Sequence, residues 1–253
     1  MMFKSFVVLL VAWMTLSGMQ SLSAAEYTFT TLDYPGAKST MLNDILGKTI
    51  IGQYSDTNGV QHGFIYDLKS TTFISLDDPA AGINQSQGTN PCGISKNNIF
   101  GNYMDSNNKM HGFEYNQQNQ RFTNIDDPAA DRKGTILIGS SGNNVVGGYL
   151  DAGGAQHGFI YNPQSKVFTT IDVPGASHDF GGGTYFNDSV GNDIVGNYFD
   201  IHGINHGFIY DTQKKHFEFI DATPGGTVKG QGTSLNDISS DLIVGIYTDV
   251  KGA

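Results

Sequence analysis

The sequence predicts an all-β protein, namely a β-propeller of five blades with four short antiparallel strands in each blade. Three sequence elements recur in the same order along the chain, and a fixed period of about 20–50 residues is typical of repeat folds. The elements are rich in β-branched and aromatic residues, and Gly, Asn, Asp and Pro separate them, which indicates strands joined by turns. No segment after the N-terminal apolar run shows an amphipathic helical period, so helices are not expected.

Each repeat reads as four strands in a fixed order. The first strand carries small residues, as in GTYFND, and the second is apolar and contains Gly-x-Tyr, as in IVGNYFD. The third strand contains His-Gly-Phe, as in HGFIY, and the fourth follows the pattern Phe-x-x-Leu/Ile-Asp. The histidines of His-Gly-Phe lie 49, 46 and 49 residues apart, at His62, His111, His157 and His206. Four strands in a repeat of this length are typical of a propeller blade.

The two ends of the chain divide one repeat between them. Residues 27–33 (YTFTTLD) form a fourth strand, whereas residues 242–249 (LIVGIYTD) end the series with a second strand. Because a propeller ring closes when one terminus completes the blade that the other began, we expect the N-terminal strand to close an incomplete fifth blade. A β-solenoid is the alternative fold, but it does not explain why the chain begins with a strand that the last repeat lacks.

The first 25 residues have the features of a secretory signal peptide. Lys4 supplies a positive charge, residues 6–16 form an apolar run, and small residues at 23–25 precede Glu26. We therefore expect residues 1–25 to be removed during bacterial-type export, and residues 26–253 to form a single repeat domain in the periplasm or outside the cell. The apolar run is shorter than the roughly 20 residues of a membrane-spanning helix, so no span is expected in the mature chain.

Charge and cysteine content exclude several classes of protein. The formal net charge is −10, which is the opposite of the basic surface that binds nucleic acid or an anionic membrane. Cys92 is the only cysteine, so an internal disulfide is excluded despite the export signal. Stability is therefore expected to come from packing and hydrogen bonds.

The repeat resembles a known family of exported bacterial proteins. The pattern G-x-Y-x-D-x-x-G-x-x-H-G-F-x-Y, followed by F-x-x-I-D-x-P-G-A, is similar to the His-Ala-Phe (HAF) extracellular repeat, with Gly in place of Ala in every copy. The resemblance covers nearly all of residues 26–253 and implies an extracellular repeat protein. It carries over no catalytic residues.

The turn before each His-Gly-Phe decides what the histidine can contact. A two-residue loop would require a positive φ at His202, so a three-residue loop with a left-handed glycine, such as Gly59, fits better. That register places Tyr54 opposite His62 and puts Asp56 on the same face as His62. We therefore expect a structural hydrogen-bond network between one aspartate and one histidine in each blade: Asp56 with His62, Asp105 with His111, Asp151 with His157, and Asp200 with His206. A shared metal is disfavoured, because each histidine belongs to its own blade.

An acidic rim is expected on the face where these turns and the loops after the fourth strands emerge. The aspartates that would join the turn aspartates there are Asp33, Asp77, Asp126, Asp172, Asp221 and Asp249. Variable loops on a regular scaffold are the usual place for ligand binding, although Asp also ends strands and caps turns for purely structural reasons. Calcium is a side hypothesis at Asp56, Asp105, Asp151 and Asp200, because hard cations bind clustered carboxylates. No other cofactor is expected.

The motifs favour a binding protein over an enzyme. The chain has no Gly-x-Ser-x-Gly, HExxH or phosphate-binding Gly loop, and its mature part has only three glutamates, Glu26, Glu114 and Glu218. We expect a secreted, non-enzymatic binding or structural scaffold in the cell envelope or extracellular matrix, with a macromolecule or a glycan as its partner. A lectin-like propeller is the alternative, ahead of a propeller glycosidase, which needs two facing carboxyl groups. An open fifth blade would also leave a sheet edge through which chains could oligomerise.

Overall fold

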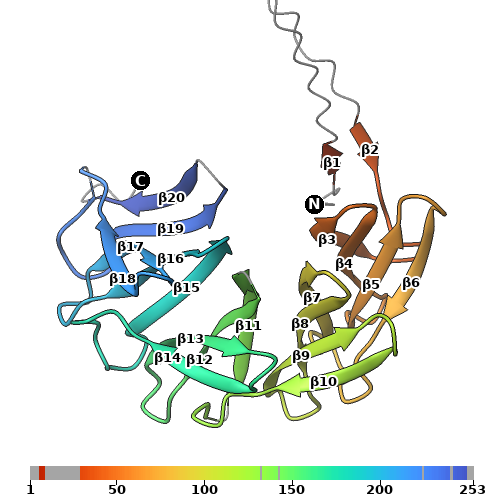
Figure 1. Ribbon diagram of the computed structural model, residues 1–253, viewed down its shortest axis with the longest axis horizontal. Helices are drawn as coiled ribbons and strands as arrows, with labels where there is room; N and C mark the ends of the chain where they lie inside the picture. Colours follow the sequence, from red (N-terminus) through yellow and green to blue (C-terminus); the bar gives the residue numbers. More distant parts are fainter. Residues whose placement is uncertain are drawn as a thin grey trace, which may run out of the picture.

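The computed structural model describes residues 6–8, 29–131, 133–141, 143–223, 225–239 and 242–249. All regular secondary structure in these ranges is β-strand. The described residues contain no helix with the length and apolar character of a membrane span. Four complete blades and two strands of a fifth follow one another along an open arc (Figure 1). The predicted all-β propeller architecture is therefore confirmed.

The four complete blades have the same four-strand plan. Blade 1 comprises β3 (Ser39–Leu46), β4 (Thr49–Ser55), β5 (Gln61–Asp67) and β6 (Thr72–Leu76). Blade 2 comprises β7 (Gly88–Ser95), β8 (Asn98–Met104), β9 (Met110–Asn116) and β10 (Arg121–Ile125). Blade 3 comprises β11 (Thr135–Ser141), β12 (Asn144–Leu150), β13 (Gln156–Asn162) and β14 (Val167–Ile171). Blade 4 comprises β15 (Gly183–Val190), β16 (Asp193–Phe199), β17 (Asn205–Asp211) and β18 (His216–Ile220), and the fifth blade has β19 (Gly232–Ile238) and β20 (Ile243–Thr248).

Within a blade, each strand pairs antiparallel with the next one along the chain. The first strands of neighbouring blades contact one another along the inner side of the arc, and the fourth strands lie on its outer side (Figure 1). A single parallel bridge joins the third strand of one blade to the first residue of the next blade, as between Gln61 and Gly88. A Cβ atom on Gly88 would lie 1.8 Å from the Gln61 carbonyl oxygen, and its φ is +122°, so only glycine fits there.

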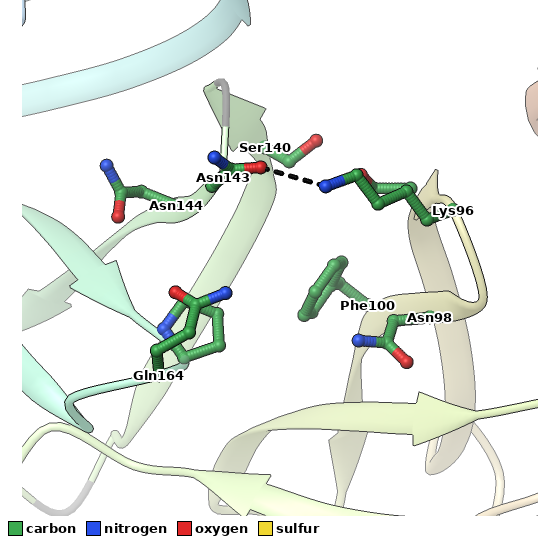
Figure 2. A pocket seen from close by; sticks show the side chains of 9 residues that line it. Lys96, Asn98, Phe100, Ser140, Asn143, Asn144 and Gln164 are labelled. Carbon is green, nitrogen blue, oxygen red and sulfur yellow. Dashed lines mark hydrogen bonds between the residues drawn. The ribbon is translucent and has the colours of Figure 1, made fainter.

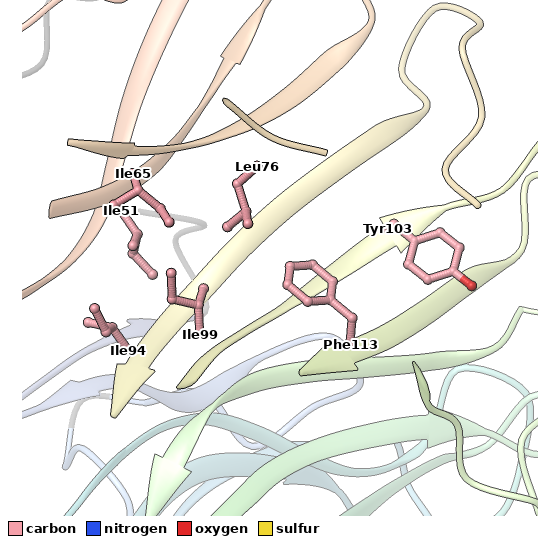
Figure 3. Close-up of a cluster of buried hydrophobic side chains, with 7 residues drawn as sticks. All are labelled: Ile51, Ile65, Leu76, Ile94, Ile99, Tyr103 and Phe113. Atoms are coloured by element: carbon pink, nitrogen blue, oxygen red, sulfur yellow. The ribbon is translucent and has the colours of Figure 1, made fainter. Parts of the chain in front are cut away.

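The hydrophobic core lies between blades rather than within them. The second strands are apolar on both faces, so they pack against the blade on either side. In the cluster between blades 1 and 2, Ile51, Ile65 and Leu76 pack against Ile99 and Phe113 (Figure 3). Equivalent clusters join blade 2 to blade 3 and blade 3 to blade 4. The blades are therefore held in a series by apolar contacts at each interface.

The predicted closure of the fifth blade by the N-terminal strand is wrong for this structure. β2 (Phe29–Thr31) pairs with β1 (Phe6–Val8), and β20 pairs only with β19 among the described strands. The reason lies in the blade plan, because every fourth strand pairs with a third strand and not with a second. The described part of the fifth blade contains no third strand, so the partner that a fourth strand takes in the complete blades is missing there.

Candidate functional site

The turn between second and third strands has the predicted three-residue form. In blade 1 the Gly59 amide donates to the Asp56 carbonyl, and the Asp56 amide donates to the Val60 carbonyl. Gly59 has a φ of +82°, and Asn108, Gly154 and Gly203 take the same conformation in the other blades. The resulting register pairs Tyr54 with His62, as predicted. The side chain of the turn aspartate also accepts the Val60 amide at 2.9 Å, which fixes the turn.

Each histidine lies between two aspartates of its own blade, an arrangement that we call the clamp. One aspartate comes from the turn and the other follows the fourth strand. The strand-end aspartate is the nearer partner, because its Oδ2 atom lies 3.2, 2.9, 2.8 and 2.7 Å from the histidine Nδ1 atom in blades 1 to 4. The turn aspartate lies 3.9, 3.6, 3.3 and 3.7 Å from Nε2 in the same order. The clamp residues are Asp56, His62 and Asp77; Asp105, His111 and Asp126; Asp151, His157 and Asp172; and Asp200, His206 and Asp221.

The structure brings each histidine and its turn aspartate together, but only the predicted hydrogen bond between Asp151 and His157 is present, and the other three pairs lie 3.6–3.9 Å apart. The closer partner was not found from the sequence. Asp77, Asp126, Asp172 and Asp221 were expected on an acidic rim; the structure leaves them partly exposed and also places each against a histidine. A tyrosine of the second strand stacks on each imidazole, as Tyr103 does on His111 with ring centroids 4.8 Å apart. The clamp thus joins the second, third and fourth strands of a blade at one end.

The electrostatics of the clamp follow from these contacts. Burial lowers the pKa of His157, but the hydrogen bonds and charges of Asp172 and Asp151 outweigh that effect, and the net shift is upward. The backbone amide of Lys109 is the main reason that the pKa of Asp105 is lowered. Burial raises the pKa of Tyr103. In blade 3 the two aspartates therefore favour the protonated form of His157.

Two buried aspartates beside the clamps were not found from the sequence. Asp78 and Asp127 are each 5% exposed, and one carboxylate oxygen of each has no hydrogen-bond partner. Burial raises the pKa of both side chains, and the charges of His111 and His157 partly oppose this. The signal was the doubled aspartate in Asp-Asp-Pro, which occurs after the fourth strand only in blades 1 and 2.

The described residues do not form a metal site. No group of three or more His, Cys, Asp or Glu side chains within the described ranges has a geometry that could hold a metal ion. Each turn aspartate directs one oxygen to backbone amides, as Asp200 does to those of His202 and Ile204, and its other oxygen faces the histidine of the same blade. The calcium hypothesis therefore does not fit this geometry. Asp33 and Asp249 lie outside the four clamps.

The acidic residues of the first strands connect blades to each other. Asp44 accepts the backbone amide of Ile94 at 2.9 Å, while Asn43 donates to the Pro91 carbonyl. The same pair recurs where Asp188 accepts the Ile238 amide, also at 2.9 Å. Asp188 is in hydrogen-bonding contact with Asp237, and burial together with that contact raises its pKa. The repeated Asn-Asp dipeptide was the signal for this contact, which sequence reasoning missed.

Three cavities lie on the face of the protein where the clamps are, which we call the clamp face. One of about 390 Å³ is lined by Asp131, Lys133, Asp151 and Phe180, and one of about 270 Å³ lies on the other side of Phe180 beside Asp200 and His202. Phe180 is 80% exposed, and the Lys133 ammonium lies 5.6 Å from its ring centroid. A third cavity, of about 380 Å³, lies beside His206 and Asp221.

The opposite face has a smaller cavity between blades 2 and 3. Figure 2 shows Phe100 at this site below Lys96, whose ammonium donates to the Asn143 side chain at 3.1 Å. Its volume is about 70 Å³. It is smaller than each of the three cavities on the clamp face.

Sequence comparison identifies no relative: no family model and no curated protein matches this chain. Comparison with solved structures finds chains of similar fold. TolB from Acinetobacter baumannii is similar with a TM-score of 0.53 at 13% identity, over 78% of this chain and 46% of the TolB chain, so this chain spans less than half of TolB. The β-propeller domain of the Trilobed protease from Pyrococcus furiosus has a TM-score of 0.42 at 13% identity, covering 82% of this chain and 85% of that one. A mutant of AofleA from Arthrobotrys oligospora has a TM-score of 0.45 at 12% identity, covering 88% and 78%. At these identities the likeness to TolB establishes the β-propeller fold and nothing further.

Proposed function

We propose that this chain is a non-enzymatic binding scaffold that is exported to the cell envelope or extracellular matrix, and that its clamp face binds the partner. The observation that carries the proposal is which contacts the repeated histidines and aspartates make. The four histidines and eight of the repeated aspartates contact one another within single blades, so they hold strand ends together and do not converge on a common reaction centre.

The clamp face is the proposed binding surface because loops of different length and sequence surround its cavities. Phe180 stands between two of them and offers an exposed ring, with a lysine on one side and carboxylates nearby. An exposed aromatic ring beside hydrogen-bonding groups is typical of binding sites for both proteins and sugars. This arrangement also supports the lectin-like alternative, in which the Phe180 ring stacks on a sugar.

A glycosidase is the second alternative, and one contact supports it. Asp188 and Asp237 meet on the inner side of the arc, and a pair of interacting carboxyl groups is an arrangement that acid–base catalysts use. Against it, Asp188 already accepts a backbone amide from the neighbouring blade. Export rests on residues 1–25 of the sequence, most of which lie outside the described residues.

A glycan array and a hydrolysis assay with aryl glycosides test these proposals on residues 26–253. Binding to a glycan that Phe180→Ala abolishes would favour the lectin. The control is Ile74→Ala, which removes an exposed apolar side chain from the outermost strand of blade 1. Hydrolysis that Asp188→Asn removes would overturn the non-enzymatic proposal. Binding to a protein ligand such as immobilised fibronectin or collagen, lost in Phe180→Ala alone, is the result expected of a matrix scaffold.

A further inference from the structure

The outer edge of β20 differs from every other second strand. β4, β8, β12 and β16 each pair on one side with a first strand and on the other with a third strand. β20 pairs with its first strand, β19, and within the described residues nothing pairs with its other side. Its backbone therefore presents an edge to which another strand can add.

The space above Gly245 indicates which side chain the added strand should place there. In the complete blades, a Cβ atom on the equivalent glycine would lie 2.6–2.7 Å from the ring tip of the phenylalanine in His-Gly-Phe; the pairs are Gly52 with Phe64, Gly101 with Phe113, Gly147 with Phe159, and Gly196 with Phe208. Each glycine therefore leaves room for one ring. At Gly245 the nearest atoms belong to Ser234 and Leu235, so no ring of a described residue fills the space.

The apolar side chains of β20 are exposed in a way that their equivalents are not. Val244 is 59% exposed, whereas Ile51, Val146 and Val195 at the same position of other blades are fully buried. Ile246 and Tyr247 are 63% and 44% exposed. Such a row of apolar residues along an unpaired edge is typical of a surface that another segment covers.

The hydrogen-bonding groups along this edge can be assigned from blade 1. The Asp56 amide bonds to Val60, so Asp56 and Val60 form a hydrogen-bonded pair. Because such pairs alternate along an antiparallel ladder, Tyr54 with His62 and Gly52 with Phe64 are hydrogen-bonded pairs as well. The equivalent residues of β20 are Tyr247 and Gly245, and their amides therefore point toward the open edge.

We propose that β20 is a docking site for an extended peptide of sequence His-Gly-Phe-aliphatic-Tyr, which adds as an antiparallel strand. Its phenylalanine lies over Gly245, its aliphatic residue lies opposite Val244, and its histidine lies opposite Tyr247. The histidine then stands near Asp249, which holds the position of the clamp aspartates, so the charges are complementary. The four internal copies of this pairing are the model for the contact, and main-chain hydrogen bonds with side-chain pockets are the general mode of strand addition.

This edge is separate from the clamp-face cavities, so the docking site is independent of the function proposed above. Its test is the binding of a capped peptide with the sequence of residues 205–211, NHGFIYD, to residues 26–253. Calorimetry should show saturable binding, and hydrogen exchange at Gly245 and Tyr247 should slow when the peptide is present. Replacing the peptide phenylalanine with alanine should weaken binding at least tenfold, because a buried aromatic side chain is lost.

A pair of variants at one position separates the edge from the side chain. Tyr247→Pro removes the outward amide while leaving the bonds to β19, and it should abolish binding. Tyr247→Ala keeps that amide and should retain binding at reduced affinity. Both variants should melt close to the parent temperature. If Tyr247→Pro is less stable, the comparison of the two peptides on the parent chain still tests the proposal, because it uses no variant of the protein.

Three outcomes would overturn the proposal. The first is no binding of the peptide to the folded parent chain, and the second is equal binding of the peptide that lacks phenylalanine. The third is concentration-dependent self-association of the chain, seen by sedimentation and lost in Tyr247→Pro, without any competition by the peptide. That result would assign the edge to a second copy of the chain.

Discussion

Replacement of His157 by alanine tests whether the clamp stabilises the fold. His157 has a 13% exposed side chain and lies 2.8 Å from Asp172 and 3.3 Å from Asp151, whose side chains are 30% and 37% exposed. A hydrogen bond to a charged group contributes roughly 1.5–3 kcal/mol when buried, and partial exposure of the aspartates reduces this. Stacking on Tyr149, at 5.0 Å between ring centroids, adds to the loss. The expected destabilisation is about 2 kcal/mol, or about 4–8 °C in melting temperature for a domain of this size.

The effect should depend on pH in a defined direction. The folded-state pKa of His157 is raised, so its contribution to stability is fully present below the unfolded value of about 6.5 and is lost as the pH rises through the folded value. The folded-state pKa of Asp151 is lowered, mainly because the Ala155 amide bonds to it. Its contribution is present above about pH 4 and is lost on acidification. The difference between parent and variant should therefore be largest between about pH 4 and 6.5.

Thermal unfolding followed by circular dichroism at pH 5.5 and pH 8.5 measures both effects. His216→Ala is the matched control, because His216 is an exposed histidine outside the clamps. We expect the His157 variant to melt several degrees lower than the control, with the larger gap at pH 5.5. Equal melting temperatures for the two variants at both pH values would refute the assignment of a stabilising role to the clamp.

Three further predictions concern other positions. Asp78→Asn should raise the melting temperature at pH 7, because it removes a buried charge while keeping the oxygen that accepts the Ala80 amide. This gain should vanish near pH 3, where the raised pKa leaves Asp78 neutral in the parent, and no gain at pH 7 would contradict the idea. Gly88→Ala should prevent stable folding or lower the melting temperature sharply, whereas Gly93→Ala, where a Cβ atom meets nothing nearer than 3.7 Å, should be tolerated; similar melting curves would show that the Gly88 contact is unimportant. Millimolar calcium should leave the melting temperature unchanged, since a ligand that binds only the native state would raise it, and a rise that chelator reverses would restore the calcium hypothesis.

The sequence predicted most of the fold because repeats multiply weak signals. A single HGFIY segment is ambiguous, but four copies in a fixed order with turn residues between them define strand order and hairpin register. Tyr54 opposite His62 followed from the choice of turn alone. The closure of the ring could not be predicted in the same way, because it depends on which strand edge is available to β2 and not on a local pattern.

The site was predicted in part for a similar reason. Asp56 and His62 are close in sequence, so turn geometry brings them together. The nearer contact, from His62 to Asp77, spans one turn and the whole fourth strand, and it depends on how far the fourth strand extends past the third. The burial of Asp78 depends on the packing of the next blade, which no local pattern reports.

Each clamp is contained within one blade, and this has a consequence for how such a chain can evolve. The turn aspartate, the histidine and the strand-end aspartate lie between the start of a second strand and the residue after a fourth, so a tandem duplication of that stretch copies a complete set. A network that drew one residue from each blade would lose its geometry whenever a repeat was inserted. Here a new copy brings its own stabilising contacts and needs only an apolar face and a first-strand glycine to join its neighbour. The gene can therefore lengthen or shorten by whole repeats while the remaining blades keep their internal bonds.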